Sequence, residues 1–280
     1  MSGTLFIVAT PIGNLEDLSP RARQTLAEVD LIAAEDTRHT GRLLSHFGVK
    51  TRLLALHDHN EADRAVALIT ELEAGKSVAL VSDAGTPLIS DPGYRLVQAA
   101  HEAGIKVSPV PGPSALTAAL SVAGLPTDRF CFEGFLPAKT KARRDALAAL
   151  ASEPRTMVFY ESVHRIDESL SDLAEVFGSE RRVFLAREMT KLHEQFLGST
   201  LGELARDSAA GSFAHKGEVV LVVAGADNIA STDIDIDRLL LELKSAVSSK
   251  VAARIAANVT GKKRNELYQR LLELEASDAE

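Results

Sequence analysis

Short apolar runs alternate with longer amphipathic stretches through the first 123 residues of the chain. The short runs predict β-strands near residues 5–9, 30–34, 52–56, 78–82 and 106–110. The longer stretches repeat their apolar residues with helical spacing and predict helices near 20–28, 39–47, 61–74, 93–103 and 114–122. Strands that alternate with helices in this way are typical of a parallel α/β sheet.

A different pattern begins at Gly124, where the run GLPTD interrupts the alternation. Beyond it, strands are predicted near 130–133, 156–161, 182–187, 194–199 and 218–224, with fewer helices between them. Only a short turn separates the segments at 182–187 and 194–199, which indicates an antiparallel hairpin within a mixed sheet. We therefore expect two unlike α/β domains, at residues 1–123 and 124–226.

The C-terminal part of the chain has a helical pattern throughout. Residues 227–233 are polar and turn-prone, as expected of a linker, and helices are predicted near 235–248, 250–258 and 262–275. Residues 233–280 are thus expected to form a small helical appendage of the helix-turn-helix size class.

The composition is that of a soluble globular protein. Of 280 residues, 45% are hydrophobic and 25% are charged, and no apolar run reaches the roughly 18 residues that span a bilayer. The single cysteine, Cys131, rules out an intrachain disulfide framework and fits a reducing cytoplasm, where we expect the protein to reside. A net charge of −8 argues against nucleic-acid binding by the surface as a whole, so that local basic clusters matter more.

Three predicted strands end in small and turn-forming residues. The runs are TPIGNL at 10–15, SDAGTPLISDPG at 82–93 and PGPSA at 111–115. Such residues let a backbone approach a ligand closely, and ligands of parallel sheets bind at the carboxyl ends of strands. In the second run, Asp91 followed by Pro92 predicts the N-cap and first residue of the next helix.

Two further strand ends carry polar clusters, EDTRHT at 35–40 and HDHN at 57–60. They place carboxylates, a guanidinium, imidazoles and an amide at the ligand edge. Helix capping is the alternative, because Asp36 or Thr37 can begin one helix and Asn60 the next. The chain shows no metal-ligand spacing and no P-loop, and residues 9–13 do not form the glycine fingerprint of dinucleotide oxidoreductases.

Further motifs complete a recognisable order: FLPA at 135–138, FYES at 159–162, AREMTK at 186–191 and KGE at 216–218. Together with the strand-end runs, they make the chain similar to the tetrapyrrole-methylase superfamily, in its branch that methylates small-subunit ribosomal RNA. The resemblance spans nearly the whole chain, and the combined spacing is far more specific than any single motif.

The resemblance implies two α/β domains with S-adenosylmethionine folded in the cleft between them, no metal, and a homodimer. It also implies methyl transfer to the ribose 2′-hydroxyl of a cytidine in the decoding region of 16S ribosomal RNA, as naked RNA or in the small ribosomal subunit. The residues that it places around the donor are Pro11, Ser82, Asp83, Ala84, Gly85, Ser114, Ala115, Glu161 and Met189. Met189 stands where related small-molecule enzymes have a glycine.

The acceptor side is expected at the polar clusters. A ribose hydroxyl is a weak nucleophile, so removal of its proton helps the reaction. The candidate catalytic residues are Glu35, Asp36, Arg38, His57 and His59, and the residues themselves leave the choice open. The candidate RNA contacts are Arg38, Lys139, Lys141, Arg143, Arg144, Arg187, Lys191, Lys262, Lys263 and Arg264.

Alternatives remain for each of these assignments. The basic cluster at 139–144 is equally explained as a solvated helix start, and the tail as a packing or dimerisation element. A methylase of a small tetrapyrrole would share the fold and the donor loops. A regulatory nucleotide-binding module without catalysis is the alternative from another functional class.

Overall fold

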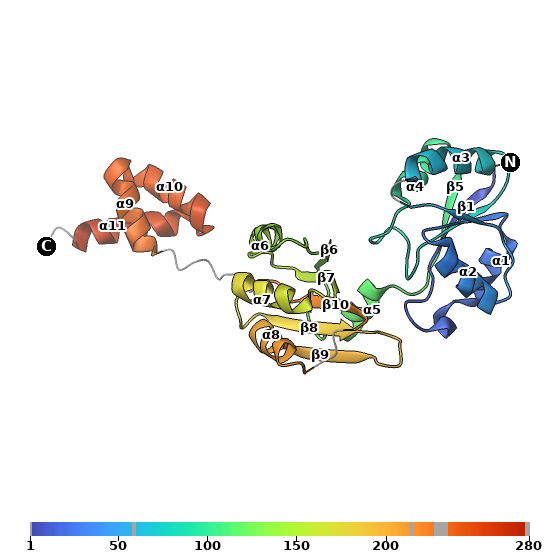
Figure 1. Cartoon of the computed structure of the whole chain (residues 1–280). Helices are drawn as coiled ribbons and strands as arrows, with labels where there is room; N and C mark the ends of the chain where they lie inside the picture. Colours follow the sequence, from blue (N-terminus) through green and yellow to red (C-terminus); the bar gives the residue numbers. More distant parts are fainter. Residues whose placement is uncertain (1, 58–59, 213–215, 227–234, 278–280) are drawn as a thin grey trace. The chain divides into compact units, whose positions relative to one another are not determined.

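The computed structural model describes residues 2–57, 60–212, 216–226 and 235–277 (Figure 1). The chain divides into two compact units, Met1–Gly225 and Ala226–Glu280, which are described separately below. Two five-stranded sheets make up the core of the first unit.

The first sheet is parallel throughout, as predicted. Its strands are β1 (Thr4–Val8), β2 (Leu31–Ala34), β3 (Leu53–Ala55), β4 (Val78–Val81) and β5 (Lys106–Val110), in the order β3-β2-β4-β1-β5. All five strands therefore end at the same edge, which carries the runs that the sequence marks as ligand loops.

Helices cover both faces of this sheet (Figure 1). A short 3-10 turn, η1 (Leu15–Asp17), follows β1, and the helices are α1 (Pro20–Glu28), α2 (Thr37–His46), α3 (Glu61–Glu73) and α4 (Tyr94–Glu102). Helices α1 and α2 bury Leu26 and Leu44 on one face, whereas α3 and α4 bury Leu68 and Leu96 on the other. Neighbouring strands β1 and β4 thus lead to helices on opposite faces, the arrangement that opens a ligand crevice in such sheets.

Local sequence fixes the start of α1 but not that of α4. Ser19 caps α1 by accepting a hydrogen bond from the Ala22 N–H, and Pro20 is the first helical residue, a position that its fixed backbone suits. The prediction that Asp91 and Pro92 begin the next helix is wrong, because α4 begins at Tyr94. A Glu61 carboxylate oxygen on α3 accepts the N–H groups of Gly93 and Arg95 at 3.1 and 2.7 Å and thereby caps α4.

The second sheet is mixed, which confirms the sequence-based expectation. Its strands are β6 (Phe130–Phe135), β7 (Thr156–Ser162), β8 (Arg182–Arg187), β9 (Gln195–Thr200) and β10 (Glu218–Val223), in the order β6-β7-β10-β8-β9. Strands β6 and β7 are parallel and the other pairs antiparallel, including the predicted β8–β9 hairpin.

Alternate residues of the second sheet point into two hydrophobic clusters. One cluster receives α6 (Thr140–Ala149), α7 (Ile166–Phe177) and α8 (Leu201–Ala209). On the other face, α5 (Ala115–Val122) packs with Val220 and Val222 of β10, beside which it is drawn in Figure 1. Helix α5 follows the last strand of the first sheet yet packs on the second. The domain boundary at Gly124 stays a prediction, with one sheet on either side of it in the sequence.

The second unit contains α9 (Ile236–Ala246), α10 (Ser249–Thr260) and α11 (Arg264–Ser277), close to the predicted ranges. They share a small core that includes Leu240, Leu267 and Leu271. The predicted linker at 227–233 lies outside the described residues. No helix within the described part of the chain has the length and apolar character needed to cross a membrane.

Candidate methyl-donor and acceptor site

The loops after β1, β4 and β5 are joined to one another by hydrogen bonds. Thr10 and Gly85 form an antiparallel bridge, in which the Thr10 N–H donates to Gly85 O at 2.9 Å and the Gly85 N–H donates to Thr10 O at 3.0 Å. The Thr86 hydroxyl donates to Pro113 O at 3.0 Å and ties in the third loop. Gly85 has φ +83°, a left-handed conformation that side chains rarely adopt, so a glycine suits the bridge.

The ends of β2 and β4 are connected through carboxylates. The Asp36 N–H donates to Asp83 Oδ1 at 3.1 Å, and the Asp83 N–H lies 3.4 Å from Glu35 Oε2. The loop after β2 and the loop after β4 therefore each provide a carboxylate that accepts a backbone N–H of the other loop. Asp83 has a structural task in addition to the donor contact that the resemblance implies for it.

A first cavity of about 360 Å³ lies against these loops, a size typical of sites for small ligands. Six predicted donor residues line it: Asp83, Ala84, Gly85, Ser114, Ala115 and Glu161. Apolar residues complete the wall, and Glu35 and Asp91 are also among the lining residues.

The other three predicted donor residues lie elsewhere. Pro11 lines a second cavity, described below. Ser82 is buried and its hydroxyl donates to Ala84 O at 3.4 Å, while Met189 is buried in the cluster that α5 covers. None of the three is among the residues that line the first cavity.

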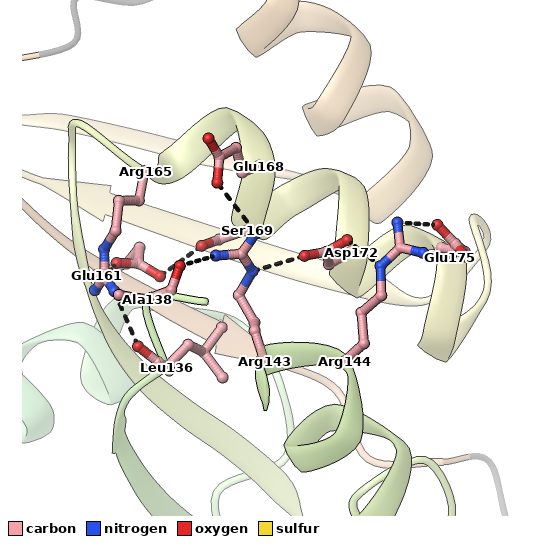
Figure 2. A network of polar contacts seen from close by, with 10 residues as sticks. All are labelled: Leu136, Ala138, Arg143, Arg144, Glu161, Arg165, Glu168, Ser169, Asp172 and Glu175. Atoms are coloured by element: carbon pink, nitrogen blue, oxygen red, sulfur yellow. Dashed lines mark hydrogen bonds and ion pairs between the residues drawn. The ribbon is translucent and has the colours of Figure 1, made fainter. Parts of the chain in front are cut away.

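The carboxylate of Glu161 is turned toward α7 and is engaged there, with a side-chain exposure of 0% (Figure 2). It accepts hydrogen bonds at 2.6 Å from both Arg165 Nη2 and the Ser169 hydroxyl. Arg165 also donates to Leu136 O at 3.1 Å. Glu161 therefore anchors the end of β7 as part of the cavity wall.

The candidate catalytic residues are differently placed. Glu35 lines the first cavity. Asp36 caps α2 and binds Arg38 at 2.9 Å, and the side-chain and backbone hydrogen bonds from Arg38 lower the Asp36 pKa to about 2. A carboxylate of such low pKa is a weak proton acceptor at neutral pH.

His57 belongs to a local turn. Its backbone N–H donates to Asn60 Oδ1 at 2.9 Å, and its imidazole Nε2 lies 3.1 Å from Asn60 Nδ2. The linings of the two cavities described here do not include His57. His59 lies outside the described residues.

Two of the predicted RNA contacts, Arg187 and Lys191, lie at the β8–β9 turn and bind other groups of the protein. Lys191 Nζ binds Glu188 at 2.8 Å and Glu218 at 2.9 Å. Burial lowers the pKa of Lys191, but these two hydrogen bonds outweigh it and raise the pKa above its ordinary value. Arg187 is buried and donates to Lys216 O at 2.8 Å and to His193 O at 3.3 Å.

Arg143, in the basic cluster on α6, is predicted by the sequence to contact RNA but is buried. Arg143 has an exposure of 1% and binds Asp172 at 2.6 Å, Glu168 at 3.2 Å and Ala138 O at 3.2 Å (Figure 2). It is closed off from RNA because its guanidinium lies inside this network. Arg144 is 43% exposed but also binds Asp172 and Glu175 at 2.6 Å. Lys139 and Lys141 remain exposed.

A second cavity of about 420 Å³ adjoins the first, with Ile12, Asp83, Ala84 and Glu218 in both linings. Its lining also contains three residues of α2: His39, which belongs to the polar cluster at 35–40, and Arg42 and His46, which sequence reasoning missed as site residues. Their spacing of three and four residues, which places them on one helix face, is the signal that indicates a common role.

The tail places its basic run at the turn between α10 and α11. Lys262, Lys263 and Arg264 are exposed and follow Gly261, whose φ of +70° ends α10. Lys263 lies 3.8 Å from Glu266. In the described parts of the chain, no three His, Cys, Asp or Glu side chains are grouped to hold a metal ion.

Comparison with known proteins identifies the family. Residues 4–205 match the model of the tetrapyrrole (corrin/porphyrin) methylases, and residues 230–275 match that of the RsmI C-terminal HTH domain.

Relatives named ribosomal RNA small subunit methyltransferase I match over nearly their full lengths. The protein of Xylella fastidiosa (strain Temecula1) is 58% identical, over 95% of this chain and 98% of its own. That of Escherichia coli O157:H7 is 55% identical, over 97% of this chain and 95% of its own. The crystal structure of the methyltransferase CobJ shares the fold, with a TM-score of 0.59 and 23% identity over 80% of this chain and 95% of its own. The chain belongs to the tetrapyrrole methylase family, in the group of the ribosomal RNA small subunit methyltransferases I.

Proposed function

We propose that the protein is an S-adenosylmethionine-dependent methyltransferase that methylates the ribose 2′-oxygen of a cytidine in the decoding region of 16S ribosomal RNA. The observation that carries the proposal is the identity of 55% and 58% with relatives named for ribosomal RNA small subunit methylation, over 97% and 95% of the chain. The proposal extends to a homodimer in the cytoplasm, where ribosomal RNA is available.

The first cavity suits a methyl donor that combines a cationic sulfonium with an adenine ring. Ile12, Ile89 and Tyr160 offer apolar and aromatic surface to a ring, and the negative charge of Asp83 suits a cation. When bound, the donor supplies an electrophilic methyl group. The three tied loops would hold it in one position, and positioning of this kind contributes on the order of 7–11 kcal/mol in favourable cases.

Among the candidate proton acceptors, we propose Glu35. It is the candidate carboxylate in the lining of the first cavity, whereas Asp36 is held by Arg38. Asp36, Arg38 and His57 then shape the acceptor side, with His59 as a further candidate. General-base assistance is worth roughly 100- to 10,000-fold in rate.

RNA contacts are proposed at cations that remain exposed. These are Arg38, Lys139, Lys141, Lys262, Lys263 and Arg264. Arg144 contributes only through the exposed part of its side chain, since Asp172 and Glu175 already engage its guanidinium. Arg187 and Lys191 hold the β8–β9 turn beside the site through the contacts described above.

The test is transfer of radiolabelled methyl from S-adenosylmethionine to small ribosomal subunits that lack the modification, followed by nuclease mapping. We expect label on a ribose 2′-oxygen of one cytidine. Glu35→Gln should retain donor affinity by calorimetry and lose at least 100-fold in turnover, whereas Glu73→Gln, an exposed change at the end of α3, should match the unaltered chain. Donor binding without label in the subunit would instead favour a small tetrapyrrole acceptor.

A further inference from the structure

The methyl donor is proposed to bind in the first cavity, so the second cavity still has no assigned ligand. It shares a wall with the first cavity, formed by Ile12, Asp83, Ala84 and Glu218. The two cavities therefore adjoin at these residues. Methyl transfer requires the acceptor oxygen to reach the methyl carbon of the donor directly, so the acceptor has to bind in a space that adjoins the donor site.

Helix α2 forms the outer side of the second cavity. His39, Arg42 and His46 are exposed and follow one another at helical spacing, so that they project on the same side of α2. The opposite side of this helix buries Leu44 against the first sheet. The three basic side chains are thus presented by an element that the core holds in place.

Of the cations that the structure describes on α2 and around the second cavity, some are paired with carboxylates and others are not. Lys191 is bound by Glu188 and Glu218, and Arg38 on the same helix is bound by Asp36 at 2.9 Å. Arg42 has no carboxylate partner among the residues that the structure describes. A guanidinium offers five N–H donors in a planar fork, the geometry that suits the oxygens of a phosphate group.

We propose that the second cavity binds the acceptor RNA strand, with Arg42 on a phosphodiester group and His39 and His46 beside it. The ribose of that nucleotide then extends past the shared residues toward the donor, so that its 2′-oxygen can approach the methyl carbon directly. The site is distinct from the exposed lysines of α6 and of the tail, because it sets the position of the reacting nucleotide as well as its affinity. The identity of the acceptor rests on the proposed function.

The proposal is tested with the full chain and a short single-stranded oligoribonucleotide of the target sequence, by fluorescence anisotropy at several salt concentrations. Arg42→Ala should weaken binding on the order of tenfold and lower the slope of log affinity against log salt by about 0.7, the value for one phosphate contact on a single strand. Arg42→Lys should keep the slope but recover only part of the affinity. Arg206→Ala, on the exposed side of α8 and outside both cavity linings, is the matched control and should bind as the unaltered chain does.

Donor affinity, measured by calorimetry, should be the same in all of these variants. The proposal is overturned if Arg42→Ala and Arg206→Ala bind the oligonucleotide equally, if Arg42→Ala loses donor affinity as well, or if the unaltered chain does not bind the oligonucleotide. It is also overturned if Arg42→Ala weakens binding only to whole subunits, which would indicate a ribosomal protein as the partner.

The two proposals fail differently. An unaltered chain that binds RNA through Arg42 but transfers no methyl group would refute the proposed function alone. A chain that methylates subunits, with the same KM after Arg42→Ala, would refute the second-cavity site alone.

Discussion

Two adjacent arginines on α6 share one carboxylate and differ in their access to water. Arg143 and Arg144 both bind Asp172 at 2.6 Å, with side-chain exposures of 1% and 43%. Removing a buried partner leaves a desolvated charge uncompensated, whereas an exposed cation is easily replaced by water. Arg143 therefore has a structural role in the interior, whereas Arg144 is a partly exposed surface cation.

We expect Arg143→Met to lower the free energy of unfolding by about 3 kcal/mol, near the lower end for a broken buried pair because Arg144 remains beside Asp172. Arg144→Met should cost clearly less. Urea denaturation followed by circular dichroism measures both. Equal losses would show that burial does not govern this network, and a loss of RNA affinity in folded Arg143→Met would return that residue to the RNA-binding set.

At the scale of elements, the bridge between Thr10 and Gly85 joins the loops of two neighbouring strands. Gly85→Ala requires a left-handed alanine, at about 1–2 kcal/mol, and brings a methyl group to 3.3 Å from Ile12 Cγ2. Gly48→Ala, at φ +69° with nothing within 4 Å of the added methyl, incurs the same backbone cost away from the cavities. Both variants should lose similar stability, and only Gly85→Ala should lose donor affinity by calorimetry. Equal donor affinity in the two would remove the bridge from the donor site.

The elements also show what a sequence can predict. Periodicity predicts the strands, the mixed second sheet and the three tail helices, because each depends on local alternation of apolar residues. It fails at the start of α4, where the cap is Glu61, some thirty residues upstream, and at Arg143, whose carboxylate partners lie on α7. Composition likewise marks the ligand loops but not the joint use of Asp83 by two strand ends. These are long-range contacts, which spacing along the chain does not encode.

At the scale of the whole molecule, the two units have separate hydrophobic cores. The basic turn at Lys262 and Arg264 belongs to the second unit, and the first cavity, where we propose the donor, belongs to the first. We expect Lys262→Glu with Arg264→Glu to weaken RNA binding and reduce its salt dependence, with donor affinity unchanged.

The matched control for the tail is Lys50→Glu with Arg52→Glu, which changes the net charge equally. These exposed residues precede β3 and so lie at the edge of the first sheet opposite to the ligand loops. Filter binding at increasing salt compares the two double variants. Equal weakening would mean that total charge, and not the tail, determines RNA affinity.

The wall common to the two cavities has a thermodynamic consequence. Ile12, Asp83, Ala84 and Glu218 contribute to both linings, so a ligand in either cavity lies beside residues that also border the other. Linkage requires that any factor by which RNA tightens the donor is also the factor by which the donor tightens RNA. If the donor and the RNA occupy the two cavities as proposed, a coupling measured on one ligand fixes the coupling on the other, and each affinity has to be stated together with the concentration of the other ligand.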